Sequence, residues 1–270
     1  MRGAGALGFC KAPAMPRIFR WGAHFGEEPP LTGEGGSGAI FFSRCTMRCI
    51  YCQNSPWSWR GGGEDVPVSS LASIMRRLAG KCANWNLVSP TPYLPFIREA
   101  AHMLAKDSIR LPFVWNTSGY ERAETIDEYR DLADVALCDL RYAHDATAIA
   151  ASSAPGYVET ARNALKRFVE IAGDKLALAR DGTATRGVIC RILVLPGHSE
   201  EAVENLAWIA GEIGTDLAVS VMSQYTPSFA AKETPPWNRG VTREEYDTVA
   251  EAAMDFGFGN GWLQIGRAHV

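Results

Sequence analysis

Apolar residues are arranged along the chain in two alternating patterns. Short continuous apolar runs, bounded by Gly, Pro, Ser or Asn, predict buried strands. Between these runs, apolar residues recur at i, i+3, i+4 and i+7, as in Leu71, Ile74, Met75 and Leu78, which predicts amphipathic helices. The predicted strands end near residues 42, 88, 117, 140, 195 and 222.

Strands and helices alternate, and this alternation predicts the fold class. The predicted helices cover residues 69–78, 97–104, 123–132, 157–172 and 199–213, and a last one opens with the capping-box pattern Thr242-x-x-Glu245. Strand–helix units of this kind predict an α/β fold with a parallel sheet and outer helices. Six units are too few for a closed eightfold barrel, so we expect an open, partial (β/α)6 barrel.

Three segments of the chain differ in composition. Residues 1–38 are rich in Gly and Pro and show no sustained period, so we predict an irregular N-terminal segment with one strand near Pro16–Trp21. Residues 39–264 carry the strand–helix units and form the predicted barrel domain. Residues 265–270 match the in-frame translation of a common sequencing adapter, so we expect a scar there and exclude it from the fold.

Composition and charge disfavour several classes of protein. A formal net charge of −3 without a basic stripe argues against nucleic-acid binding. No apolar run approaches the 18 or more residues of a membrane span. Residues 1–23 lack the continuous apolar stretch of a signal peptide. We therefore expect a cytoplasmic protein in a reducing compartment.

Three cysteines, Cys45, Cys49 and Cys52, stand at a CxxxCxxC spacing directly after the first strand of the predicted barrel. Thiolates are soft ligands that suit iron–sulfur clusters and zinc. Such clusters usually have four cysteine ligands, so a local set of three leaves one iron without a protein ligand. An open coordination position is typical of a metal site that performs chemistry.

The three cysteines could also bind structural zinc, form disulfide bonds or simply be buried. Disulfide bonds are disfavoured in a reducing compartment. Zinc sites usually carry a second cysteine or histidine pair, and the sequence has none at suitable spacing. The isolated cysteines Cys82, Cys138 and Cys190 are predicted to be small buried hydrophobic residues.

The segment from Cys45 to Cys52, with the aromatic Tyr51 before its last cysteine, resembles the cluster motif of the radical S-adenosylmethionine (radical SAM) superfamily. The resemblance implies a [4Fe–4S] cluster on the three cysteines, whose open iron is chelated by the amino and carboxylate groups of SAM. An electron from the cluster then cleaves SAM to a 5′-deoxyadenosyl radical, which abstracts hydrogen from a substrate. The partial barrel is also the fold that the resemblance implies.

Further segments resemble one branch of that superfamily, uncharacterised iron–sulfur proteins similar to pyruvate formate-lyase-activating enzyme. The resemblance runs from about Leu7 to Gln264 and includes residues 24–38. In that branch a cysteine-rich segment often ends in Gly-x-Cys, like Gly8-Phe9-Cys10 here; its earlier cysteines are missing, so we expect a chain that lacks its original start. The branch implies an activase-like role on a glycine of a glycyl-radical-type partner protein, with flavodoxin or ferredoxin as the low-potential electron donor.

Barrels of parallel strands carry their active sites at the C-terminal ends of the strands. Polar residues at those ends, together with one aromatic residue in the cluster motif, are the predicted cofactor-binding set: Tyr51, Thr91, Asn116, Ser118, Asp139 and Arg191. We predict no catalytic side chain beyond the three cluster ligands.

The resemblance gives several of these residues their expected roles. Tyr51 is expected either to contact adenine or to be a core aromatic residue. Ser89-Pro90-Thr91 occupies the place where the superfamily commonly carries a Gly-Gly-Glu turn that meets the SAM amino group. Asn116 and Ser118 resemble a turn near the ribose.

Asp139 and Arg191 are charged residues in predicted barrel strands. The related activating enzymes have Asp-x-Lys where this chain has Asp139-Leu140-Arg141. A charged side chain in a barrel strand is costly unless it is paired. We therefore expect Arg191 to pair with the SAM carboxylate or with a barrel carboxylate such as Asp139.

Two competing interpretations remain at the level of sequence. One is a non-catalytic iron–sulfur or zinc protein, whose site is closed by His24 or Cys10 as a fourth ligand and which has no affinity for SAM. The other is an inactive fragment of a radical SAM enzyme.

Overall fold

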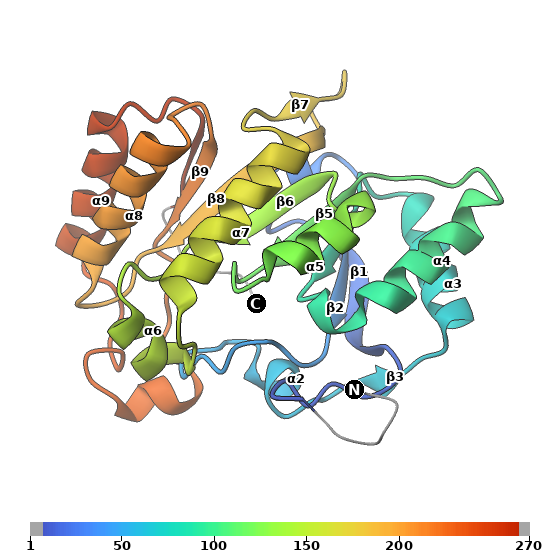
Figure 1. Cartoon of the computed structure of the whole chain (residues 1–270), viewed down its shortest axis with the longest axis horizontal. Coiled ribbons are helices and arrows are strands. Elements are labelled where there is room, and N and C mark those ends of the chain that lie inside the picture. Colours follow the sequence, from blue (N-terminus) through green and yellow to red (C-terminus); the bar gives the residue numbers. More distant parts are fainter. Residues whose placement is uncertain (1–7, 265–270) are drawn as a thin grey trace.

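The computed structural model describes residues 8–264, which fold around one curved sheet (Figure 1). The strands are β1 (Arg17–His24), β2 (Ser37–Phe42), β3 (Glu64–Asp65), β4 (Trp85–Val88), β5 (Phe113–Thr117), β6 (Val135–Asp139), β7 (Ala177–Leu178), β8 (Ala184–Leu193), β9 (Ala218–Met222) and β10 (Gly261–Gln264). Their order is β10-β9-β8-β6-β5-β4-β2-β1-β3, with β7 paired to β8. The strands from β2 to β10 along this order are mutually parallel, and β1 lies antiparallel to β2. The predicted parallel sheet with outer helices is confirmed.

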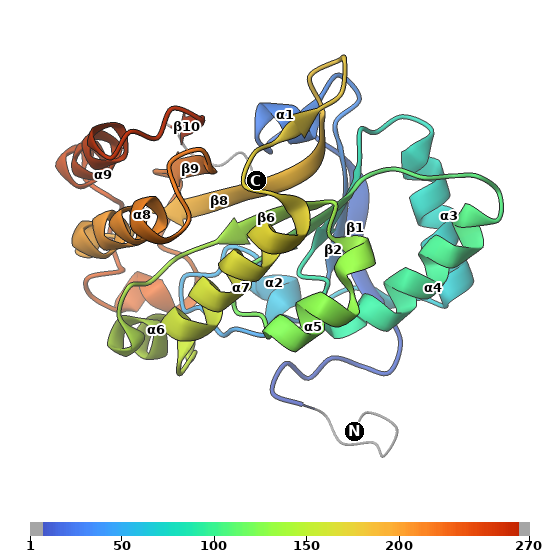
Figure 2. The same cartoon turned by 45° about the horizontal axis from the view of Figure 1, so that its top comes forward.

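The longer helices line the outer side of the sheet. The helices are α1 (Pro29–Thr32), α2 (Ser55–Ser58), α3 (Val68–Ala79), α4 (Leu94–Ala105), α5 (Ala123–Glu128), α6 (Asp145–Ser152), α7 (Tyr157–Ala172), α8 (Ser199–Glu212) and α9 (Arg243–Asp255). Figure 2 shows α3, α4, α5, α7, α8 and α9 following one another around the sheet in the order of the strands they cover.

Helix α7 illustrates how the apolar period produces this packing. Its buried positions include Ala161, Leu165 and Phe168, which lie on one face at helical spacing. The ring of Phe168 packs edge-on against Trp115 of β5, with 5.4 Å between the ring centroids. Gly173 ends the helix with φ +95°, a conformation that glycine adopts without steric cost.

The core has an outer and an inner part. The outer part lies between the sheet and the helices and contains alternate strand side chains such as Phe42, Trp85 and Trp115. Cys138 and Cys190 are also buried there, as predicted. A smaller cluster on the other face of the strands includes Leu31 of α1, which packs with Val114, Leu137, Ile189 and Ala218. The connection between β1 and β2 therefore fills part of the inside of the barrel.

The strand predicted near Pro16–Trp21 is present as β1, which continues to His24 because its backbone pairs along β2, with one shift in register. The structure differs from the sequence prediction at other elements. The helix predicted over 123–132 breaks after Glu128 and continues as a 3₁₀ turn. Helix α6 and the short parallel strand β10 were not predicted, since neither has a sustained apolar period. The capping box of Thr242 and Glu245 is present at the start of α9.

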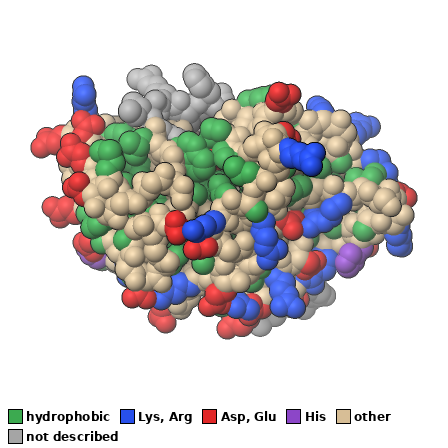
Figure 3. Space-filling view, turned by 90° about the horizontal axis from the view of Figure 1, so that it is seen from above, with side chains coloured by type: hydrophobic (Ala, Val, Ile, Leu, Met, Phe, Trp, Pro, Cys, Tyr) green, Lys and Arg blue, Asp and Glu red, His purple; other side chains and the backbone are tan. Residues whose placement is uncertain are grey.

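Figure 3 shows the end of the barrel that faces upward in Figure 1, where acidic and basic side chains surround a group of apolar ones. The residues predicted for the cofactor lie at the opposite end of the strands. Residues 265–270, predicted to be a scar, lie outside the described residues. Within residues 8–264, no helix combines the length and the apolar character needed to cross a bilayer.

Candidate active site

The cysteine loop, residues 43–54, follows β2 and runs along the lower edge of the molecule in Figure 1. Two backbone hydrogen bonds attach it to the C-terminal end of α6. The N–H of Arg48 donates to the carbonyl of Ser152, and the N–H of Ile50 donates to the carbonyl of Ala151. The protein backbone alone therefore holds the loop against helix α6.

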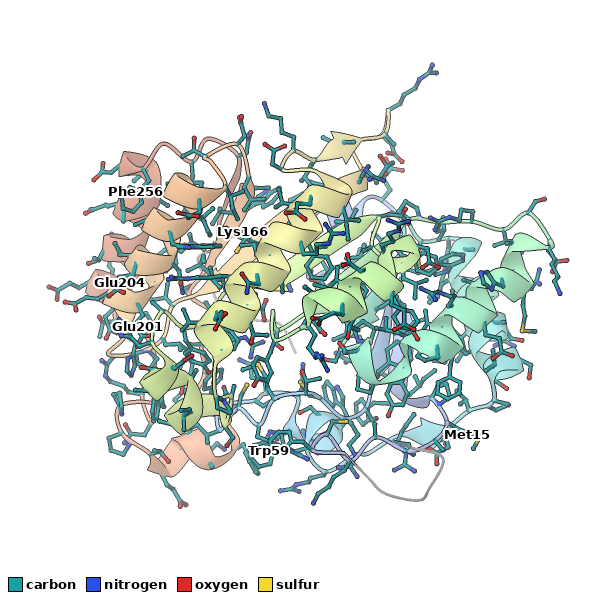
Figure 4. All side chains as sticks on the ribbon, viewed as in Figure 1. Met15, Trp59, Lys166, Glu201, Glu204 and Phe256 are labelled. Carbon is teal, nitrogen blue, oxygen red and sulfur yellow. The ribbon has the colours of Figure 1, made fainter. Side chains whose placement is uncertain are left out.

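Helix α6 is itself anchored by a buried carboxylate of α8. The Glu201 side chain, which projects toward α6 in Figure 4, accepts hydrogen bonds from the backbone N–H groups of Ala143 and His144 and from the hydroxyl of Thr147. These bonds satisfy donors at the start of α6. The support of the cysteine loop thus extends to the neighbouring strand–helix unit.

Two of the three cysteines meet donors from elsewhere in the fold. An Nη1 of Arg141 donates to the Sγ of Cys49 at 3.2 Å. The Sγ of Cys52 lies 3.1 Å from the Oγ of Ser58 in α2. Hydrogen bonds to cysteine sulfur are a known means of adjusting the potential of an iron–sulfur cluster.

Burial makes the free thiols hard to ionise. It raises the pKa of Cys45 and raises the pKa of Cys52 to about 12, and the neighbouring Cys49 adds to both shifts. Cysteine binds a metal as its thiolate, so binding through all three side chains would place three negative charges in this buried loop. Positive charge is needed to balance them. The iron ions of a cluster supply that charge.

A cluster and a single metal ion require different arrangements of protein ligands. Within residues 8–264, no three Cys, His, Asp or Glu side chains converge tightly enough to hold one metal ion. Neither Cys10 nor His24 completes such a group. In a [4Fe–4S] cluster each cysteine binds a different iron, so its ligands need not converge on one point. The three cysteines of the loop are therefore compatible with a cluster.

A small, narrow hollow lies beside Cys45. The residues that line it come from the cysteine loop and from the C-terminal ends of β4 and β5: Cys45, Thr46, Ser89, Thr91, Pro92, Thr117, Ser118 and Glu121. Two of the predicted cofactor residues, Thr91 and Ser118, are thus brought together beside a cluster ligand.

Glu121, which was not predicted from the sequence, supplies the carboxylate of this pocket. Its side chain is only 3% exposed, and its Oε1 accepts hydrogen bonds from the hydroxyls of Thr91 and Thr117. Its Oε2 has no hydrogen-bond partner among the described residues. Burial raises the pKa of Glu121 to about 7, although Thr117, Thr91 and the indole of Trp115 each lower it.

Asp139 lies at the end of β6, where it pairs with Arg141. The Nε of Arg141 donates to Oδ2 of Asp139 at 3.0 Å, and the two side chains are 20% and 13% exposed, Arg141 first. Since Arg141 also reaches Cys49, this pair connects a predicted cofactor residue to a cluster ligand.

Arg191 and Asn116 belong to a second, deeper network inside the barrel. The guanidinium of Arg191 pairs with Glu27 and Glu28, so carboxylates inside the barrel supply the expected pairing, although Asp139 is not the direct partner. Glu27 also accepts a hydrogen bond from Asn86, which in turn accepts one from Asn116. These two glutamates become the partners because the β1–β2 connection, which was predicted to be irregular, enters the barrel and brings them with it.

Tyr51 is a core residue in this structure. It is 5% exposed, and its hydroxyl bonds to that of Tyr142, which continues to Ser152 at the end of α6. Its ring lies 5.4 Å from the ring of Tyr225, centroid to centroid. Of the two interpretations considered for Tyr51, the structure shows the core aromatic residue.

Gly119 fixes the turn that places Glu121, and we expect its replacement to be costly. Its φ is +80°, and a Cβ there would lie 2.3 Å from the carbonyl oxygen of Asp139. Gly119→Ala is expected to lower the free energy of unfolding by roughly 2–4 kcal/mol, from left-handed strain and steric overlap together. Gly156→Ala is the matched control, because φ is +65° but nothing lies within 4 Å, and it should cost only about 1–2 kcal/mol. Urea unfolding of both variants measures the difference, and equal losses would contradict the steric effect.

Comparison with known proteins agrees with this geometry. The profile of the radical SAM superfamily matches residues 39–207, more than half of the chain. The uncharacterized protein MJ0674 of Methanocaldococcus jannaschii is 29% identical over 242 residues, which cover 86% of this chain and 65% of that protein. The chain therefore spans about 65% of the length of this curated relative.

Solved structures show the same fold at low sequence identity. The FeFe-hydrogenase maturase HydG from Carboxydothermus hydrogenoformans is 12% identical, with a TM-score of 0.57 over 85% of this chain and 53% of its own. SuiB of Streptococcus suis bound to S-adenosylmethionine is 11% identical, with a TM-score of 0.54 over 83% of this chain and 48% of its own. Members of the superfamily use a [4Fe–4S] cluster and SAM, and the cysteine loop and its adjoining pocket suit both. The chain belongs to the radical SAM superfamily.

Proposed function

We propose that this radical SAM enzyme abstracts hydrogen from a peptide or protein, and specifically from a glycine of a partner protein in an activase-like reaction. The single observation that carries the proposal is the distribution of the remaining cysteines. Cys82 is buried apart from the others, whereas Cys138 of β6 and Cys190 of β8 are register partners on neighbouring strands, so outside the cysteine loop the described residues hold no set of three cysteines for an auxiliary cluster. The arrangement favours a single-cluster enzyme of the activase type.

Two further observations support a peptide or protein substrate. The segment from Arg191 to Gly197 closely resembles the corresponding strand of the activating enzymes. SuiB has been solved with its precursor peptide SuiA and anSMEcpe with the peptide Cp18Cys, at TM-scores of 0.50 and 0.54 to this chain. Because these two proteins share only the fold with it, they support a peptide substrate by analogy.

The residues around the pocket have three tasks in such a reaction. When bound, the cluster and SAM supply the one-electron cleavage and the hydrogen-abstracting radical. Cys45, Cys49 and Cys52 would hold the cluster, and the hydroxyls of Thr91 and Ser118 would bind polar groups of SAM. Met47, which is 1% exposed, helps to keep water from the loop.

We also propose a low-potential electron donor, such as flavodoxin or ferredoxin, and a cytoplasmic setting. Support comes from the chemistry of the site, since the seven cysteines are free thiols and a reducing compartment maintains them.

Isotope transfer tests the proposed substrate. The anaerobically reconstituted and reduced enzyme would be incubated with SAM and a glycyl-radical-type partner protein labelled with α-deuterated glycine. We expect deuterium in the 5′-deoxyadenosine product and a glycyl radical signal in the electron paramagnetic resonance (EPR) spectrum. The control is the same partner labelled at alanine, which should transfer none. Product formation without deuterium transfer from glycine would contradict the activase-like role.

A further inference from the structure

The pocket beside Cys45 contains an unsatisfied buried acceptor. The carboxylate of Glu121 is 3% exposed, yet its Oε2 makes no well-formed hydrogen bond to any described residue; the indole N–H of Trp115 lies close enough to lower the pKa of Glu121 but is itself left without a well-formed bond. Roughly nine in ten or more of the buried polar groups in proteins have a partner, and an exception needs an explanation. The other oxygen, Oε1, accepts from both Thr91 and Thr117, at 2.6 Å from the latter, so the orientation of the carboxylate is fixed.

The chemistry of the lining restricts what can satisfy Oε2. The other polar side chains that line the pocket are hydroxyls and the Cys45 thiol, so Glu121 is its one carboxylate and no Lys or Arg lines it. A buried carboxylate is stabilised by a hydrogen bond from an N–H donor. The chemistry of the lining therefore suits an amino group placed next to Cys45.

The backbone at the end of β4 points to the same location. Ser89 has φ +57°, a left-handed conformation that is uncommon outside glycine. Ser89 begins a turn that reaches Thr91. The side chains of this turn carry no charge, and the hydroxyl of Thr91 donates a hydrogen bond to the carboxylate of Glu121. A carboxylate is thus delivered to this turn from the loop after the neighbouring strand, β5.

We propose that the Oε2 of Glu121 accepts a hydrogen bond from the α-amino group of SAM, and so holds the amino acid end of the cofactor beside Cys45. This inference rests on SAM as the cofactor and is independent of the proposed glycine substrate. Thr91 and Thr117 act as positioning residues that orient the carboxylate.

Binding of two ligands tests the proposal directly. Glu121→Gln keeps the size of the side chain and removes its charge. Titration calorimetry of the reconstituted protein would compare SAM with an analogue in which hydrogen replaces the α-amino group. We expect Glu121→Gln to weaken SAM binding about tenfold to a hundredfold, as for loss of a hydrogen bond to a charged group. Affinity for the analogue should be the same in the variant and the original protein.

Two further variants separate binding from folding. Glu124→Gln, on the exposed side of α5, is the matched control and should leave the affinity for SAM unchanged. Glu121→Asp keeps a carboxylate and should retain part of the preference for SAM over the analogue. Iron content and the thermal midpoint are measured for every variant.

Three results would overturn the role of Glu121. The first is SAM binding by Glu121→Gln that is as tight as in the unaltered protein, and the second is an equal loss of affinity for SAM and for the analogue in that variant. The third is a folded Glu121→Asp that shows no preference for SAM over the analogue. If the unaltered protein itself fails to bind SAM, the cofactor assignment falls with it. Failure of deuterium transfer from glycine, in contrast, would leave the binding results intact.

Discussion

Cys49→Ser is expected to abolish the iron–sulfur cluster and, with it, the cleavage of SAM. The structure brings three cysteines to the loop after β2, and within residues 8–264 neither Cys10 nor His24 stands by as a fourth ligand. Serine offers a harder oxygen donor in place of a thiolate, and it also loses the sulfur atom that Arg141 contacts at 3.2 Å. Iron and sulfide content, the cluster absorption and the release of 5′-deoxyadenosine should all fall to background.

Cys82→Ser is the control for this experiment. Cys82 is also buried, at 7% exposure, but it lies just after α3 and away from the cysteine loop. This variant should keep its cluster and its activity. Full iron content and activity in Cys49→Ser would contradict the assignment of the ligands.

Arg191→Met is expected to produce the largest loss of stability among single substitutions in the barrel. Its guanidinium is 14% exposed and neutralises two carboxylates, Glu27 at 7% and Glu28 at 0% exposure. Removing one partner of a buried ionic group leaves uncompensated charge, which typically costs about 3–5 kcal/mol. Urea unfolding at neutral pH measures this loss.

The loss should depend on pH in a defined direction. Burial alone would raise the pKa of Glu28, but Arg191 overcomes this and holds the pKa below its usual value. In the unaltered protein, this interaction contributes stability above the ordinary pKa of glutamate, and the contribution is lost as the pH falls through the lowered pKa. Without Arg191, burial would raise the pKa of Glu28, and protonation would relieve its unpaired charge. The difference between Arg191→Met and the unaltered protein should therefore shrink as the pH falls.

Two variants complete the test of this network. Arg98→Met removes an exposed pairing with Asp131 and should cost no more than about 1 kcal/mol. The double variant Glu28→Gln with Arg191→Met should recover part of the stability, because it removes one buried charge. A loss in Arg191→Met no greater than that in Arg98→Met would contradict the buried network.

Features that depend on local pattern could be predicted from the sequence. The three cysteines lie within eight residues, and their spacing alone indicates a cluster loop after a strand. Strands and helices of the barrel follow from apolar runs and periods, which are also local. Helix α7 begins and ends at the predicted residues because a clear period is bounded by Gly156 and Gly173.

Features that depend on distant contacts could not be derived in this way. Arg191 is separated from Glu27 and Glu28 by 164 and 163 residues, so its partners become apparent only when the β1–β2 connection enters the barrel. Glu121 belongs to no recognisable motif and was missed. Its position just after the Ser118-Gly119 turn of a barrel strand was the one available signal.

The outcome for Tyr51 shows a second limit of sequence reasoning. An aromatic residue beside a cluster ligand is compatible both with an adenine contact and with the core. Only the positions of Tyr142 and Tyr225, from distant parts of the chain, show that its hydroxyl and ring are directed into the core.

EPR spectroscopy of the anaerobically reconstituted, dithionite-reduced protein, with and without SAM, tests the central claim most directly. We expect a [4Fe–4S]⁺ signal that changes when SAM is added, because three cysteine ligands would leave one iron of the cluster available to SAM. A cluster signal indifferent to SAM, or zinc in place of iron, would contradict this claim.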